Sequence, residues 1–177
     1  MNPTPQATEA LSLQLHSELP PLAGDIQAQV QLLVTTLSGA FGVGINEVAL
    51  YHLDEERSVL KFLWPEKLKN VGAIPYSSFD SLAARTAREG IVLIENSFAS
   101  QRHANAYEKI RLTSGVAAPP KPIQKIISAP IMKGEDICGV VQLSRKGAEN
   151  DPQIEDFVGS DADALLTLTG VFGQHFG

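Results

Sequence analysis

The chain has 177 residues, of which 44% are hydrophobic and 19% charged, a composition typical of one globular domain that needs no disulfide or structural metal. Its net charge of −6, with 14 lysines and arginines spread thinly, argues against nucleic acid and anionic lipid as direct partners. Because the chain has one cysteine, no signal-peptide pattern and no apolar run near the roughly 18 residues of a membrane span, we expect a cytoplasmic protein.

Residues 1–21 are predicted to form an N-terminal extension that precedes one domain over residues 22–177. Apolar residues recur at every fourth position of the extension, which predicts a short helix with one apolar face. Two consecutive prolines end this helix. The apolar positions are Ala7, Leu11 and Leu15.

The clearest helix of the sequence begins at Leu22. Its apolar residues are spaced by 4, 4, 3, 4 and 4 positions up to Phe41, which places them along one side of a helix. Gly42 and Gly44 are expected to end it.

The rest of the domain is predicted to contain two strands, a helix, a strand, an irregular segment, two strands and a closing helix, in that order. The strand predictions cover residues 45–53 and 58–64, 91–95, and 123–132 and 137–144, and the helix predictions cover 81–89 and 160–176. A polar turn joins the first pair of strands and a turn around Gly134 joins the last pair, so both pairs are predicted hairpins. Apolar residues on both faces of the first strand predict a sheet that is covered on both sides.

These elements predict an α/β fold of the α+β type. Its centre is an antiparallel sheet of five or six strands with the terminal helices on one face. The irregular segment over residues 96–111 and the loop over 113–122 are left to cover the other face, and we expect a ligand pocket there.

The middle segment carries the best candidate groups for binding. It combines amide, hydroxyl, guanidinium and aromatic side chains, which a ligand lid uses for hydrogen bonds and stacking. The alternative is a solvated connection pinned by Phe98 and Tyr107. The candidate ligand-binding residues are Asn96, Ser100, Arg102, His103, Tyr107 and Tyr76.

The sequence offers little for catalysis or metal binding. The four histidines are far apart and none has a partner at metal-ligand spacing. Cys138 lies within an apolar strand, where a small buried hydrophobic residue is expected. We therefore expect no enzyme activity, no metal and no cofactor, with an unidentified small molecule as the remaining ligand.

The late hairpin resembles the corresponding part of GAF domains, a family of sensory modules in signalling proteins. The resemblance rests on residues 126–131 and on the strand over 137–143, where an apolar-Gly-Val-apolar-Gln-Leu pattern follows a polar turn. It also includes the helix over 81–89 and the strand that follows, and it covers roughly residues 24–176. The resemblance implies a regulatory domain that binds a small molecule and dimerises.

Two motifs of the family can be compared with this sequence. In the motif of cyclic-nucleotide-binding members, only Arg102 is identical to the family's residue. In the second motif Lys146, Phe157 and Asp161 are kept, whereas Arg145 replaces an asparagine. The family implies a structural salt bridge between Lys146 and Asp161. Cyclic-nucleotide binding is therefore our third interpretation. Bilin attachment in the family needs a cysteine beside the pocket, and Cys138 lies in the wrong strand for this role. Methionine sulfoxide reduction by members of the family uses several cysteines, and one cysteine cannot form the disulfide that turnover needs.

The excess of apolar residues on the terminal helices predicts a homodimer through these helices. The competing interpretation is that the N-terminal helix folds back over the excess within one chain. An output domain or a partner protein in trans would receive the signal. The alternative function is a purely structural dimerisation domain whose pocket is filled by its own side chains. The predicted dimer contacts are Leu22, Ile26, Val30, Leu33, Leu37, Leu165, Leu168 and Phe172.

Overall fold

The computed structural model describes residues 2–100, 121–149 and 151–176. In this part of the chain six antiparallel strands form one sheet in the order β3-β2-β1-β6-β5-β4. The prediction of an antiparallel sheet with five or six strands is confirmed, and both predicted hairpins are present. The strands are β1 (Val48–Asp54), β2 (Val59–Trp64), β3 (Ala73–Pro75), β4 (Leu93–Glu95), β5 (Ile123–Lys133) and β6 (Asp136–Lys146).

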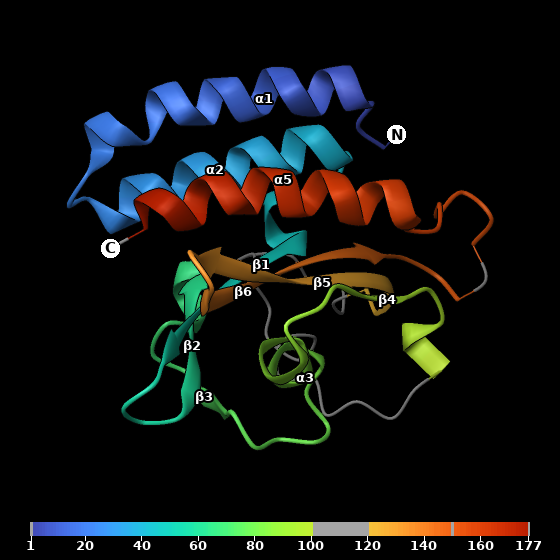
Figure 1. The fold of residues 1–177 in the computed structure, drawn as a ribbon. Helices are drawn as coiled ribbons and strands as arrows, with labels where there is room; N and C mark the ends of the chain where they lie inside the picture. Colours follow the sequence, from blue (N-terminus) through green and yellow to red (C-terminus); the bar gives the residue numbers. More distant parts are fainter. Residues whose placement is uncertain (1, 101–120, 150, 177) are drawn as a thin grey trace.

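The helices lie on the two faces of the sheet as the hydrophobic pattern predicts (Figure 1). α2 (Ile26–Phe41) and α5 (Gly159–His175) pack on one face, and α3 (Leu82–Glu89) packs on the other. α1 (Pro5–Glu18) forms a further layer on the outside of α2 and α5. The layers of the fold are therefore α1, then the pair α2 and α5, then the sheet, and then α3.

The alternation of side chains along β1 divides the core into two parts. Val48 and Leu50 lie in a hydrophobic cluster with α2 and α5, whereas Ala49 and Tyr51 lie in a second cluster with α3. All four side chains are buried. Successive residues of a strand point to opposite faces, so β1 is buried on both sides, as its sequence predicts.

Local signals in the sequence set the ends of the helices. The side chain of Asp25 accepts a hydrogen bond of 3.0 Å from the backbone N–H of Ala28 at the start of α2. Gly42 ends the same helix with φ of 62°, a conformation that favours glycine. Ser81 and Gly90 begin and end α3 in the same way.

The N-terminal helix is anchored through its C-terminal half. Leu15 has no exposed surface, nor does Leu19 in the turn that follows α1, and both belong to the cluster between the helices and the sheet. α1 therefore folds back over α2 and α5, as our competing interpretation of the sequence describes. Part of the apolar excess that we used to predict a dimer is covered within the chain.

Burial corrects the choice of residues for a dimer contact. Six of the eight side chains are buried within the chain itself, because they hold α2 and α5 on the sheet. Of the other two, Leu22 is half-buried and Ile26 is 43% exposed. A contact through this layer must therefore use other residues. The six buried side chains are Val30, Leu33, Leu37, Leu165, Leu168 and Phe172.

α5 approaches β5 so closely that one helical position has no room for a side chain. A Cβ atom on Gly173 would lie 2.0 Å from the carbonyl oxygen of Met132, whereas a Cβ on Gly170 of the same helix would meet nothing within 4 Å. Gly173→Ala should lower the free energy of unfolding by roughly 1–3 kcal/mol, because backbone cannot move aside as a flexible side chain can. Gly170→Ala should raise it by up to about 1 kcal/mol, because alanine favours a helix.

Urea denaturation of the two variants measures this difference. Equal effects of the two substitutions on the free energy of unfolding would show that α5 does not lie this close to β5.

Candidate functional site

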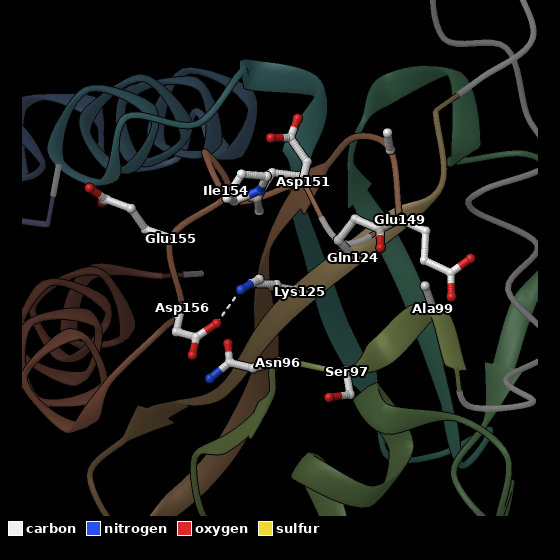
Figure 2. Close-up of a pocket in the computed structure, with 12 residues that line it drawn as sticks. Asn96, Ser97, Ala99, Gln124, Lys125, Glu149, Asp151, Ile154, Glu155 and Asp156 are labelled. Atoms are coloured by element: carbon white, nitrogen blue, oxygen red, sulfur yellow. Dashed lines mark hydrogen bonds and ion pairs between the residues drawn. The ribbon is translucent and has the colours of Figure 1, made fainter.

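A cavity of about 670 Å³ lies at the end of β4, beside the first residues of β5. The connector over residues 147–158, which joins β6 to α5, forms its other wall (Figure 2). Asn96 and Ser97 line it from the end of β4, and Gln124 and Lys125 line it from β5. The cavity thus lies where the middle segment begins.

Asn96, a predicted ligand-binding residue, holds this wall together. Its side-chain Nδ2 donates a hydrogen bond of 2.9 Å to the carbonyl oxygen of Phe157, and its Oδ1 accepts one of 2.9 Å from the N–H of Phe157. The asparagine amide thus forms hydrogen bonds with both backbone polar groups of Phe157, as the backbone of a neighbouring strand would. Asn96 therefore ties β4 to the connector and also lines the cavity.

Most of the other candidate residues cannot be placed relative to this cavity. Arg102, His103 and Tyr107 lie outside the described residues, and Ser100 is the last described residue before them. Tyr76 is half-buried and packs against the cluster beneath α3, and its hydroxyl lies 3.5 Å from the carbonyl oxygen of Ala87. Tyr76 is not among the residues that line the cavity.

The charges of the described residues that line the cavity are mainly negative. The connector contributes the four carboxylates of Glu149, Asp151, Glu155 and Asp156. The ammonium group of Lys125 forms an ion pair with Asp156, so its charge is locally balanced (Figure 2). A cleft lined mainly by one sign of charge attracts ligands of the opposite sign. The described lining residues therefore carry an excess of negative charge.

Backbone contacts give the connector its path along β5. The carbonyl oxygen of Gly147 accepts a hydrogen bond of 3.1 Å from Gln124, and its N–H donates one of 3.1 Å to Pro122. The side chain of Ile154 folds onto Gly147, where an added Cβ would lie 2.4 Å from the Ile154 Cδ1 atom. These contacts hold the connector beside the start of β5.

Arg145 at the end of β6 is the site residue that sequence reasoning missed. Its Nη1 donates to the carbonyl oxygens of Glu155 and Asp156 at 2.6 and 3.3 Å, and its Nη2 donates to Asn2 Oδ1 at 2.7 Å. The guanidinium also lies 4.3 Å from the centre of the Phe157 ring, within the range of a cation–π contact. The one signal in the sequence was the replacement of the family's asparagine at this position.

The structure gives Lys146 and Asp161 contacts other than the predicted salt bridge. The Asp161 Oδ2 atom accepts hydrogen bonds from the N–H of Val158 and from Asn2, and its buried Oδ1 has no hydrogen-bond partner among the described residues. Lys146 Nζ lies 3.4 Å from the carbonyl oxygen of Asn46. Asp161 caps the first turn of α5 and is fully buried, so its role is local to that helix and to the N-terminus.

A chain of buried polar side chains crosses the other face of the sheet beneath α3. Tyr51 donates to Gln142 at 3.1 Å, and Gln142 donates to the hydroxyl of Ser128 at 3.2 Å. The hydroxyls of Ser128 and Thr86 share a hydrogen bond of 2.7 Å, and Thr86 also bonds the carbonyl oxygen of Leu82 at 2.9 Å. Each hydroxyl proton in this series has an acceptor when the hydrogen bonds are donated in one direction, from Tyr51 toward Leu82. Burial raises the pKa of Tyr51, so this hydroxyl keeps its proton.

Cys138 and the three histidines that the structure describes form no reactive cluster. The Cys138 side chain is half-buried and lies 3.4 Å from the carbonyl oxygen of Ile131, and burial raises the pKa of its thiol. Among the described residues, no three His, Cys, Asp or Glu side chains are close enough together to hold a metal ion. No helix within the described ranges has the length and apolar character that crossing a membrane requires.

Solved structures resemble this chain over nearly its whole length. Neither a protein-family model nor a curated protein matches the sequence. The GAF domain of a phosphoenolpyruvate-protein phosphotransferase from Coxiella burnetii is 11% identical, with a TM-score of 0.69 over 95% of this chain and 91% of that one. The GAF domain of the Acinetobacter phosphoenolpyruvate-protein phosphotransferase is 14% identical, with a TM-score of 0.65 over 93% and 92% of the two chains.

An enzyme shares the same architecture. Free methionine-R-sulfoxide reductase from Neisseria meningitidis, solved in complex with its substrate, is 16% identical, with a TM-score of 0.63 over 97% of this chain and 89% of that one. At these identities the likeness concerns the arrangement of strands and helices. The chain has the fold of a GAF domain.

Proposed function

We propose that this chain is a regulatory, non-catalytic module that binds a small cationic molecule in the cavity beside β4. The observation that carries the proposal is the cavity itself, which is large enough for a small organic ligand and combines amide, hydroxyl and carboxylate groups on its walls. The similarity of the whole chain to GAF domains of phosphotransferase proteins and to a methyl-accepting chemotaxis protein supports a role in regulation. A further domain or a partner protein would receive the signal.

The electrostatics of the cavity favour an amine or a guanidinium compound over a phosphate. Four carboxylates face one ammonium group, and that group is already paired with Asp156. A cyclic nucleotide would bring a further negative charge to this wall without a free cation to receive it among the described lining residues. We therefore do not retain cyclic-nucleotide binding as a function of this cavity.

The cysteine chemistry supports a non-catalytic role. The sulfoxide reductases with this fold show that it can host an enzyme. A thiol-based reduction that ends in an intramolecular disulfide needs two cysteines, and this chain has one. Cys138 packs against the cluster on the face of the sheet toward α2 and α5, away from α3 and the cavity.

A structural domain that binds nothing is the second candidate, and one observation favours it. Buried apolar side chains and the buried hydrogen-bonded series from Tyr51 to Thr86 lie between α3 and the sheet. If the cavity beside β4 takes up no ligand, these packed side chains favour a scaffold. A ligand screen separates the two candidates.

We also propose that the module forms a homodimer through its helical layer. Exposed apolar residues remain on that layer after α1 has folded back, including Leu13 at 65% exposed and Leu166 at 40% exposed. A two-fold axis that brings two such layers together would cover these residues in both copies.

The ligand proposal can be tested by thermal shift with simple probes. Arginine, agmatine and spermidine should raise the melting temperature, and AMP should not. Glu149→Gln should weaken the binding of a cation by roughly 0.5–1 kcal/mol, since it removes one attractive charge. Asp156→Asn should weaken it more, because it also leaves Lys125 unpaired beside the cavity.

Glu56→Gln is the matched control, because Glu56 is exposed in the turn between β1 and β2 and does not line this cavity. The proposal of a cationic ligand fails if AMP stabilises the protein more than the amines do, or if the three variants respond alike.

The reactivity of Cys138 provides a second test. Because burial raises the pKa of its thiol, less thiolate is present at any pH between 7 and 9 than in the unfolded chain. Iodoacetamide should therefore react more slowly with the folded protein than with the urea-unfolded chain. The reaction rate rises with pH in both, and the midpoint of this rise should lie at a higher pH for the folded protein. A folded rate above the unfolded one would indicate an activated thiol and would reopen the case for an enzyme.

Light scattering at micromolar concentration tests the dimer. A mass near twice 19.0 kDa should fall toward 19.0 kDa in Leu13→Glu or Leu166→Glu, whereas Phe79→Glu, on the loop before α3, should leave it unchanged. Because these positions are exposed, the three substitutions should change the free energy of unfolding by no more than about 0.5 kcal/mol. A mass of 19.0 kDa for the unmodified chain would refute the dimer.

A further inference from the structure

One guanidinium joins the wall of the cavity to the N-terminus of the chain. Arg145 donates to the carbonyl oxygens of Glu155 and Asp156, which line the cavity, and to the side chain of Asn2. Asn2 and Arg145 are 143 positions apart in sequence. Both contacts come from the same planar group, so they constrain each other's geometry.

The contacts at the N-terminus continue into the first turns of two helices. Asn2 donates a hydrogen bond of 3.0 Å to the Asp161 carboxylate, which caps the start of α5. Thr4, two residues later, caps the start of α1 by accepting a hydrogen bond from Ala7. Movement of Asn2 therefore acts on the N-terminal half of α1.

That half of α1 is the more weakly held. Leu15 and Leu19 anchor the other end without any exposed surface, whereas Thr8 is the single buried side chain in the first eight positions of the helix. Segments with few buried apolar contacts open at low free-energy cost. The first two turns of α1 are therefore the part of this helix that should separate at the lowest free-energy cost, since Leu11 packs against the core only with a partly buried side chain.

We propose that Arg145 couples the cavity to the docking of α1. When the connector shifts, the guanidinium shifts with the carbonyl groups that it holds and Asn2 loses the hydrogen bond from Arg145. Asn2 is then held by Asp161 alone among the described residues, and the first turns of α1 detach from α2 and α5. Detachment exposes the surface of α2 and α5 on which the first turns of α1 lie. The regulatory meaning of this coupling rests on the proposed function, but the coupling itself requires no ligand and can be measured in the free protein.

Hydrogen exchange followed by mass spectrometry tests the coupling on the complete chain. Lys125→Met removes the ion pair that holds Asp156 and loosens the connector without touching α1. Exchange in peptides covering residues 6–12 should then rise by about fivefold or more, the lower end of typical coupling between sites. In an Arg145→Met background, where α1 is already uncoupled, Lys125→Met should add nothing.

Coupling must also act in the reverse direction. Asn2→Ala should raise the exchange of residues 151–156 by a similar factor. Arg85→Met is the matched control, since it removes an exposed ion pair with Glu89 on α3 and should leave both segments unchanged. If Lys125→Met raises exchange throughout the β5–β6 hairpin as well, Asp156→Asn replaces it as the change to the connector.

Faster exchange of the connector with unchanged exchange of α1 would overturn the inference. So would equal effects of Lys125→Met in the presence and absence of Arg145. A failure of every cationic probe to bind is a separate outcome, because it refutes the proposed function and leaves the measured coupling in place.

Discussion

The β5–β6 hairpin is buried on both faces, and the rest of the molecule is arranged to cover it. Each of its strands has 11 residues, and the central residues of both have almost no exposed surface. α5 lies against one side at Gly173, and β1 continues the sheet so closely that Gly139 has no room for a Cβ atom beside the carbonyl oxygen of Tyr51. The two glycines let backbone meet backbone on two sides of one hairpin, which fixes both the helical layer and the sheet order.

The cavity follows from how the chain leaves this hairpin. β6 ends beside the start of β5, and the chain must then cross the end of the sheet to reach the first turn of α5. Along this crossing its backbone groups are satisfied by side chains from distant segments, namely Asn96, Gln124 and Arg145. Because these partners hold the backbone and leave the carboxylates of the connector at the wall, the crossing produces an acidic cavity.

Periodicity in the sequence was enough to predict the architecture and too little to predict the site. The stripe on α2 and the two apolar faces of β1 identify a sheet covered on both sides, since these patterns depend on local burial. Residue types did not predict that the Asp161 carboxylate caps its own helix and contacts Asn2, and the Lys146–Asp161 salt bridge stays a prediction. Arg145 went unrecognised because its partners are backbone carbonyl groups and an asparagine far away in sequence, and such contacts leave no pattern of residue types. The dimer residues were chosen from hydrophobicity, which does not distinguish a core stripe from an interface stripe.

The hydrogen-bond chain from Tyr51 to Thr86 has a direction, and this restricts how α3 can move on the sheet. Gln142 accepts at its oxygen and donates from its nitrogen, so rotating its amide by half a turn would leave the Tyr51 proton without this acceptor and would require Ser128 to donate instead of accept. α3 joins the series through the hydrogen bond of 2.7 Å between the hydroxyls of Thr86 and Ser128, so sliding α3 along the sheet would break a bond between two buried hydroxyls. Because breaking a buried hydrogen bond costs free energy, this bond favours the observed position of α3 over neighbouring ones.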